Sequence, residues 1–117
     1  VLRHGDVELN RMERRVTRCG RAVELTVKEL SLLEFLLQRR GRCCTRSELL
    51  REVWQMSPDA GTNVVDVYVN YLRRKLGMDG DGYAVIETVR GEGYRMGGVA
   101  AMVARVDAYP EAVLAGA

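Results

Sequence analysis

The chain has 117 residues, of which 47% are hydrophobic and 29% are charged, and its formal net charge is +2. This composition is typical of one soluble globular domain, and no apolar run approaches the ~18–20 residues that a membrane-spanning helix needs. A single histidine, His4, and three cysteines, two of them adjacent, argue against most hydrolases, a His-rich metal site and a disulfide framework. We therefore expect a cytoplasmic protein without metal or cofactor.

Residues 7–25 have the pattern of short strands. Val7 and Leu9 alternate with polar neighbours, and Val16, Val23 and Leu25 can supply more of a buried face. Residues 19–20 are Cys-Gly, a link of the length that joins two antiparallel strands. The sequence therefore predicts a small antiparallel sheet of three or four strands.

A helix is predicted over residues 27–40. Thr26 and Glu29 have the spacing of a capping box, in which each side chain bonds to the backbone N–H at the other position. Leucines then recur at helical spacing, and Gly41 follows two arginines where the helix should stop.

A second capping box, Thr45 with Glu48, predicts a shorter helix that runs through Trp54. Residues 55–62 contain Pro, Asp and Gly and are expected to form a loop.

A third helix is predicted over residues 63–76. Val65, Val69, Leu72 and Leu76 recur at i, i+4, i+7 and i+11, which places them on one narrow stripe. Residues 77–82 are rich in Gly and Asp and should form a loop.

A hairpin is predicted over residues 85–96, with Gly91 and Gly93 permitting its turn. Residues 1–96 thus form one α+β domain, in the order sheet, three helices and hairpin. Residues 97–117 are a separate tail that is rich in Ala and Val, and its state is left open between helical packing, a linker and disorder.

The third helix carries the most informative chemistry. Its outer face holds Asn63, Asp66, Asn70 and Arg74, with Val67 among them. In the major groove of B-DNA, Asn can pair with adenine, Arg with guanine, and an aliphatic side chain can touch a thymine methyl group.

Two further arginines extend this potential surface. Arg90 at the hairpin tip could reach a neighbouring minor groove, and Arg46 could bind a phosphate at the start of the second helix.

These segments resemble the winged helix-turn-helix effector domain of OmpR/PhoB-type response regulators. The resemblance covers residues 5–96 and rests on LTVKE (25–29), RSELL (46–50), VW (53–54), NVVDVYV (63–69), LRRKL (72–76) and ETVRGEGYR (87–95). It implies an N-terminal antiparallel sheet, three helices and a C-terminal β-hairpin wing. It also implies sequence-specific binding of double-stranded DNA in two-component phosphorelay control of transcription. Residues 63–76 would be the recognition helix in the major groove, and residues 85–96 the wing in the minor groove.

The resemblance also implies which residues contact DNA. Phosphate or groove contacts are expected from Arg46, Trp54, Thr88, Arg90 and Tyr94. Base-facing contacts are expected from Asn63, Val67, Tyr68, Asn70, Tyr71, Arg73 and Arg74. Some members of the family have basic residues at the positions of Asn70 and Tyr71, so this chain should bind non-specific DNA less strongly and read a different site.

The family further implies partners. Its members bind direct repeats as tandem dimers, and the loop at residues 55–62 corresponds to one that can face RNA polymerase. The usual N-terminal phospho-acceptor receiver domain is missing from this chain, and Val1 is not a start methionine. We therefore expect a fragment of a two-domain regulator.

The sequence argues against two other functions and leaves a third open. Residues 91–93, Gly-Glu-Gly, begin like a dinucleotide-binding motif, but Met96 breaks that motif and the glycines lie in a hairpin, so no enzyme is expected. Cys19, Cys43, Cys44 and His4 lack the spacing of a structural zinc site. The most serious alternative is a winged-helix protein-interaction module that does not bind DNA, because the net charge is nearly neutral.

Overall fold

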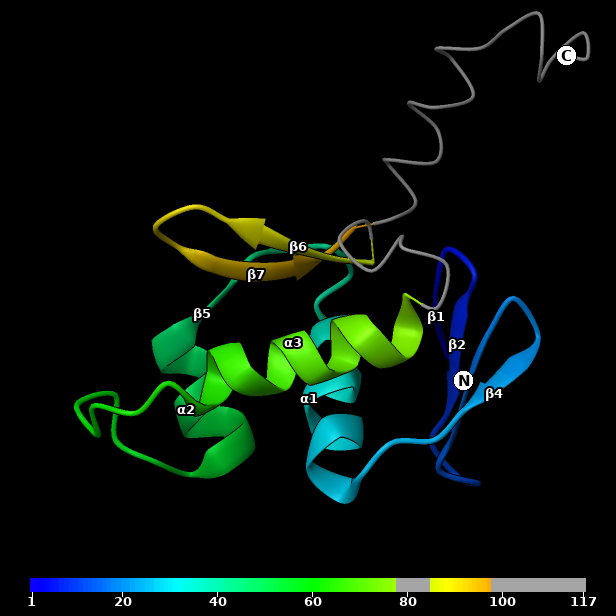
Figure 1. Ribbon diagram of the computed structural model, residues 1–117, viewed down its shortest axis with the longest axis horizontal. Coiled ribbons are helices and arrows are strands. Elements are labelled where there is room, and N and C mark those ends of the chain that lie inside the picture. Colours follow the sequence, from blue (N-terminus) through cyan, green and yellow to red (C-terminus); the bar gives the residue numbers. More distant parts are fainter. Residues whose placement is uncertain (78–84, 98–117) are drawn as a thin grey trace, which may run out of the picture.

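The computed structural model describes residues 1–77 and 85–97 (Figure 1). Its strands in chain order are β1 (Leu2–His4), β2 (Val7–Asn10), β3 (Arg15–Arg18), β4 (Arg21–Val23), β5 (Cys44–Thr45), β6 (Ile86–Val89) and β7 (Gly93–Met96). The helices are α1 (Val27–Gln38), α2 (Arg46–Trp54) and α3 (Val64–Leu76). This is the predicted order of sheet, three helices and hairpin. Within the described residues, no helix has the length and apolarity to cross a membrane.

The N-terminal sheet is antiparallel, in the order β1-β2-β3-β4. Leu9 and Val23 both lie opposite Val16, and Val7, Leu9 and Val16 are buried. The sheet predicted over residues 7–25 is therefore confirmed, including the two-residue link at Cys19 and Gly20. Strand β1 adds a strand to this sheet at residues that precede the predicted range.

Helix α1 begins with the complete capping box that the sequence predicts. Thr26 Oγ1 accepts from the Glu29 backbone N–H at 3.2 Å, and Glu29 Oε1 accepts from the Thr26 N–H at 2.8 Å. The helix ends at Gln38, two residues earlier than predicted, and Arg40 and Gly41 then adopt positive φ angles of 52° and 85°. A left-handed backbone cannot continue an α-helix, so the chain turns there towards β5.

Helix α2 has only half of its predicted capping box. Thr45 Oγ1 accepts from the Glu48 backbone N–H at 3.0 Å. The Glu48 carboxylate instead lies 3.5 Å from the Arg39 guanidinium at the end of α1. This ion pair joins the two helices, which a purely local capping pattern does not predict.

Helix α3 packs across the other two helices, and its buried side is the predicted stripe. Val65, Val69, Leu72 and Leu76 are all buried, which confirms the phase of the helix. Asn63 is the N-cap residue but makes no capping hydrogen bond with its side chain. Lys75 Nζ donates to Glu29 Oε1 at 2.6 Å and so ties α3 to the start of α1.

The wing is the outer part of a three-stranded sheet, in the order β5-β7-β6. Strand β5 was not predicted, and it changes the interpretation of Gly93. Gly91 has the positive φ that the turn requires (73°), whereas a Cβ atom on Gly93 would lie 2.0 Å from the Cys44 carbonyl oxygen. Gly93 is therefore needed for the close approach of β7 to β5 and not for the turn.

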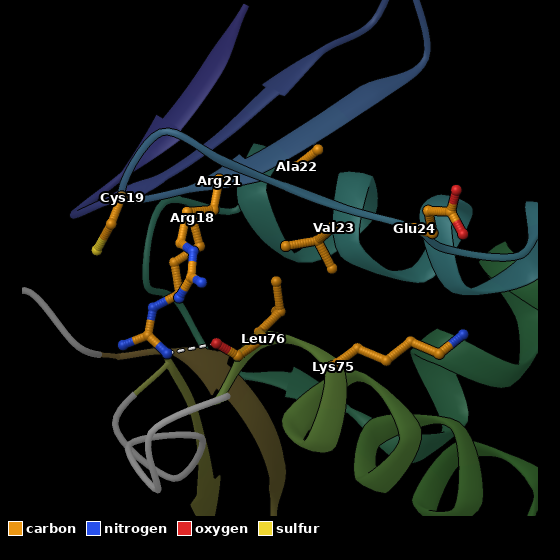
Figure 2. A pocket seen from close by; sticks show the side chains of 8 residues that line it. All are labelled: Arg18, Cys19, Arg21, Ala22, Val23, Glu24, Lys75 and Leu76. Carbon is orange, nitrogen blue, oxygen red and sulfur yellow. Dashed lines mark hydrogen bonds between the residues drawn. The ribbon is translucent and has the colours of Figure 1, made fainter.

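The far end of α3 is fixed to the N-terminal sheet. Arg18 donates to the backbone carbonyl of Leu76 (Figure 2). It also pairs with Asp6 at 3.2 Å. A groove of about 490 Å³ lies beside this contact, between the β3–β4 hairpin and the end of α3. Its lining contains none of the residues predicted to contact DNA.

Most of the loop predicted at residues 77–82, and the tail at residues 97–117 apart from Gly97, lie outside the described residues. The loop predicted at residues 55–62 is confirmed (Figure 1).

Candidate nucleic-acid interface

The exposed side of α3 carries the amides and the guanidinium that the sequence places there. Asn63, Asn70 and Arg74 are exposed, Tyr71 is 38% exposed, and Val67 is partly exposed. These side chains lie opposite the buried aliphatic stripe, so they can meet a ligand without disturbing the core. A polar helix face of this kind fits the major groove of B-DNA.

A row of aromatic rings borders this face. Trp54 at the end of α2 meets Tyr68 edge-on, with ring centroids 5.3 Å apart, and Tyr68 meets Tyr71 in the same way at 5.3 Å. The Arg74 guanidinium lies 5.3 Å from the centre of the Tyr71 ring, within the range of a cation–π contact. Trp54 and Tyr68 are thus held by ring contacts beside the polar face.

At the start of α2, Arg46 is engaged within the protein. Its Nε donates to Asp66 Oδ1 at 2.8 Å, and its Nη2 is 3.4 Å from the Tyr94 hydroxyl. The side chain is still 43% exposed. Part of the guanidinium can therefore meet a phosphate while the bond to Asp66 is kept.

Tyr94 is only 4% exposed, so its ring lies inside the protein, and its predicted contact with phosphate or the groove stays a prediction. Its hydroxyl donates to the Asp66 carboxylate. Burial raises the pKa of Tyr94, and the hydrogen bond to Asp66 raises it further. At neutral pH the tyrosine therefore remains a neutral hydrogen-bond donor.

Asp66 is the acceptor that joins these groups. Burial acts to raise the pKa of its carboxyl, but the hydrogen bonds from Tyr94 and Arg46 and the Arg46 charge outweigh burial and lower it. The same pairing raises the pKa of Arg46. Asp66 was expected only as an outer-face residue, because its partners are 20 and 28 positions away and no local pattern reveals them.

Arg73 also turns towards the wing. Its Nε and Nη2 donate to the Ile86 carbonyl at 2.9 and 2.7 Å, and Nη2 donates to Thr88 Oγ1 at 2.6 Å. These contacts direct the guanidinium to the wing, and the base-facing contact that the resemblance implied stays a prediction. Arg73 lies on the side of α3 next to the hairpin, and the outer face is left to Asn70 and Arg74.

The wing tip presents the remaining predicted residues. Thr88 and Arg90 are exposed, and the Glu92 N–H donates to the Val89 carbonyl at 2.9 Å to close the turn. Within residues 1–77 and 85–97, neither Arg74 nor Arg90 forms an ion pair. Both guanidinium groups are therefore available to an anionic ligand.

The described residues contain no group of three or more His, Cys, Asp and Glu side chains that could hold a metal ion. Cys44 is fully buried, and burial, followed by the nearby Glu48 charge, raises the pKa of its thiol to about 11. Burial likewise raises the pKa of Cys43. Neither thiol has the lowered pKa that a reactive cysteine needs.

Residues 20–96 match the family model described as "Transcriptional regulatory protein, C terminal". The chain is 42% identical over 96 residues to the transcriptional regulatory protein TcrA of Mycobacterium tuberculosis, which covers 82% of this chain and 38% of TcrA. It is 42% identical over 91 residues to CusR of Escherichia coli, covering 78% of this chain and 40% of CusR. The chain thus spans about two fifths of the length of these relatives.

Solved structures are similar over the same part of the chain. The DNA-binding domain of CpxR from E. coli superposes with a TM-score of 0.71 and 32% identity, covering 82% of this chain and 95% of that domain. The RstA DNA-binding domain of Klebsiella pneumoniae, solved in complex with the RstA box, superposes with a TM-score of 0.75 and 27% identity. That match covers 83% of this chain and 96% of the RstA domain, and it confirms the predicted winged-helix architecture.

Proposed function

The chain belongs to the family of C-terminal domains of transcriptional regulatory proteins, and on this premise we propose that it binds specific sites on double-stranded DNA. Helix α3 lies in the major groove, and the β6–β7 wing reaches the adjacent minor groove. The observation that carries the proposal is the two-sided nature of α3. Its aliphatic side is buried, its other side presents Asn70 and Arg74 to solvent, and Arg90 is exposed at the turn of the wing.

The residues divide by role. Asn63, Val67, Asn70, Tyr71 and Arg74 meet base edges, because they share the exposed side of α3. Arg46, Thr88 and Arg90 meet phosphate or the minor groove at the two flanks. Trp54 and Tyr68 support the helix through their edge-on ring contacts.

The whole protein, in this proposal, is a cytoplasmic two-component response regulator. The relatives are about twice as long as this chain, which leaves room for a receiver domain. The domain binds direct repeats as a tandem dimer, and the exposed loop at residues 55–62 faces RNA polymerase. It performs no catalysis.

The alternative is an interaction module that binds protein and not DNA, which the net charge of +2 favours. Selection of bound sequences from random duplexes, at two salt concentrations, separates the two. A DNA reader returns one motif, and its affinity falls about tenfold or more from low to physiological salt. An interaction module returns no motif. Recovery of no enriched sequence at either salt concentration would refute the proposed function.

A further inference from the structure

Helix α3 is tied to the wing at both of its ends. Asp66, in the first turn, accepts hydrogen bonds from Tyr94 on β7 and from Arg46. Arg73, in the last turn, donates to Ile86 and Thr88 on β6. The two tie points are seven positions apart, or about 10 Å along the helix axis. Two attachments at this separation fix the angle between the wing and α3. A single attachment would let the wing rotate about it.

The buried ring of Tyr94 contacts an arginine from each of these two attachments. The Arg46 guanidinium carbon is 5.0 Å from the ring centre, and that of Arg73 is 5.5 Å away. Both are within cation–π range. Movement of the hairpin relative to α3 would therefore break the Arg73 and Asp66 hydrogen bonds and these ring contacts together.

We propose that Arg73 and Asp66 are positioning residues, which hold the wing at the angle where Arg90 and the outer face of α3 engage DNA simultaneously. This proposal rests on the proposed function. Arg73 acts through the hairpin and not through a base, because its Nε and Nη2 both donate to the wing.

A double-mutant cycle tests the proposal on the full 117-residue chain. Arg73→Lys keeps the charge but cannot reproduce the two bonds from one planar group to the Ile86 carbonyl. Arg74→Met is the matched control, because Arg74 is the adjacent arginine and contacts Tyr71, not the wing. Each variant is made with and without Arg90→Ala, and its affinity is measured on the selected duplex.

In the wild-type and Arg74→Met backgrounds, we expect Arg90→Ala to weaken binding by about tenfold. In the Arg73→Lys background the same change should cost about twofold or less, because the wing is no longer held in place. A tenfold loss that persists in Arg73→Lys would overturn the positioning role. Asp66→Asn should reduce the effect of Arg90→Ala in the same way.

Amide hydrogen exchange in the free protein gives a readout that needs no DNA. Arg73→Lys should speed exchange in β6 and β7 by about tenfold relative to α1, and Arg74→Met should not. Unchanged exchange in the wing would refute the attachment even if the affinities change. Failure of the wild-type chain to bind any duplex would contradict the proposed function, and the exchange data would then decide the attachment alone.

Discussion

The ion pair between Glu29 and Lys75 gives a stability prediction that depends on pH. Glu29 is 3% exposed, and its Oε1 accepts from both the Thr26 N–H and Lys75 Nζ. Glu29→Gln keeps the shape of the side chain but removes the negative charge from these two bonds. Because Lys75 is 37% exposed, water can solvate its ammonium group in the variant. We therefore expect a loss of about 1–3 kcal/mol in the free energy of unfolding at pH 7, below that of a fully buried pair.

The sign of the pH dependence follows from the direction of the pKa shift. Burial acts to raise the pKa of Glu29, but the hydrogen bonds from Lys75 and Thr26 and the Lys75 charge lower it below its ordinary value. The folded state therefore favours the carboxylate, and this contribution is fully present above the unfolded pKa, which is about 4.3. The contribution disappears as the pH falls through the lower folded pKa. The stability difference between wild type and Glu29→Gln should accordingly shrink on acidification.

Urea unfolding at pH 7 and at a series of acidic pH values measures both effects. Glu34→Gln is the matched control, because Glu34 also lies on α1 and pairs with an arginine, Arg11, at 3.1 Å, but on the surface. That exposed pair should contribute less than about 1 kcal/mol. Equal losses in the two variants at pH 7, or a Glu29→Gln loss that does not change with pH, would refute the reasoning.

Three further outcomes are expected. Arg90→Ala should weaken binding to all duplexes and lower the salt slope by about one contact, and an unchanged slope would contradict a wing contact with DNA. Asn70→Ala should change the preferred base at one position, by about 1–3 kcal/mol for a bidentate pair, and sequence selection with both proteins checks this. Leu72→Ala should cost about 2–5 kcal/mol of stability because Leu72 is fully buried, and a thermal midpoint equal to that of wild type would contradict its burial.

The elements that local chemistry specifies could be predicted from the sequence. Periodicity alone gave the buried stripe of α3, and the structure confirms Val65, Val69, Leu72 and Leu76 as buried. The Thr26 and Glu29 capping box is also confirmed. In each case the interacting residues lie within a few positions of one another, so the spacing along the chain carries the information.

The interactions that were missed connect distant segments. Strand β5 is two residues long and exists because β7, about 50 positions later, pairs with it. The Glu48 carboxylate pairs with Arg39 at the end of α1 and not with the Thr45 backbone N–H. Asp66, Arg73 and Tyr94 meet only after the wing has folded back onto α3, so their shared role could not be read from spacing. The predicted contacts of the twelve site residues with DNA remain predictions.

The arrangement of the arginines reconciles a nearly neutral chain with binding to a polyanion. Arg46 and Arg73 have protein acceptors, and each guanidinium also lies near the ring of Tyr94. Arg46 and Arg73 hold α3 and the wing together, while Arg74 and Arg90 present positive charge to solvent. Net charge alone therefore says little about affinity here. A rigid surface loses little freedom on binding, so a few well-placed cations and amides can act together on both grooves.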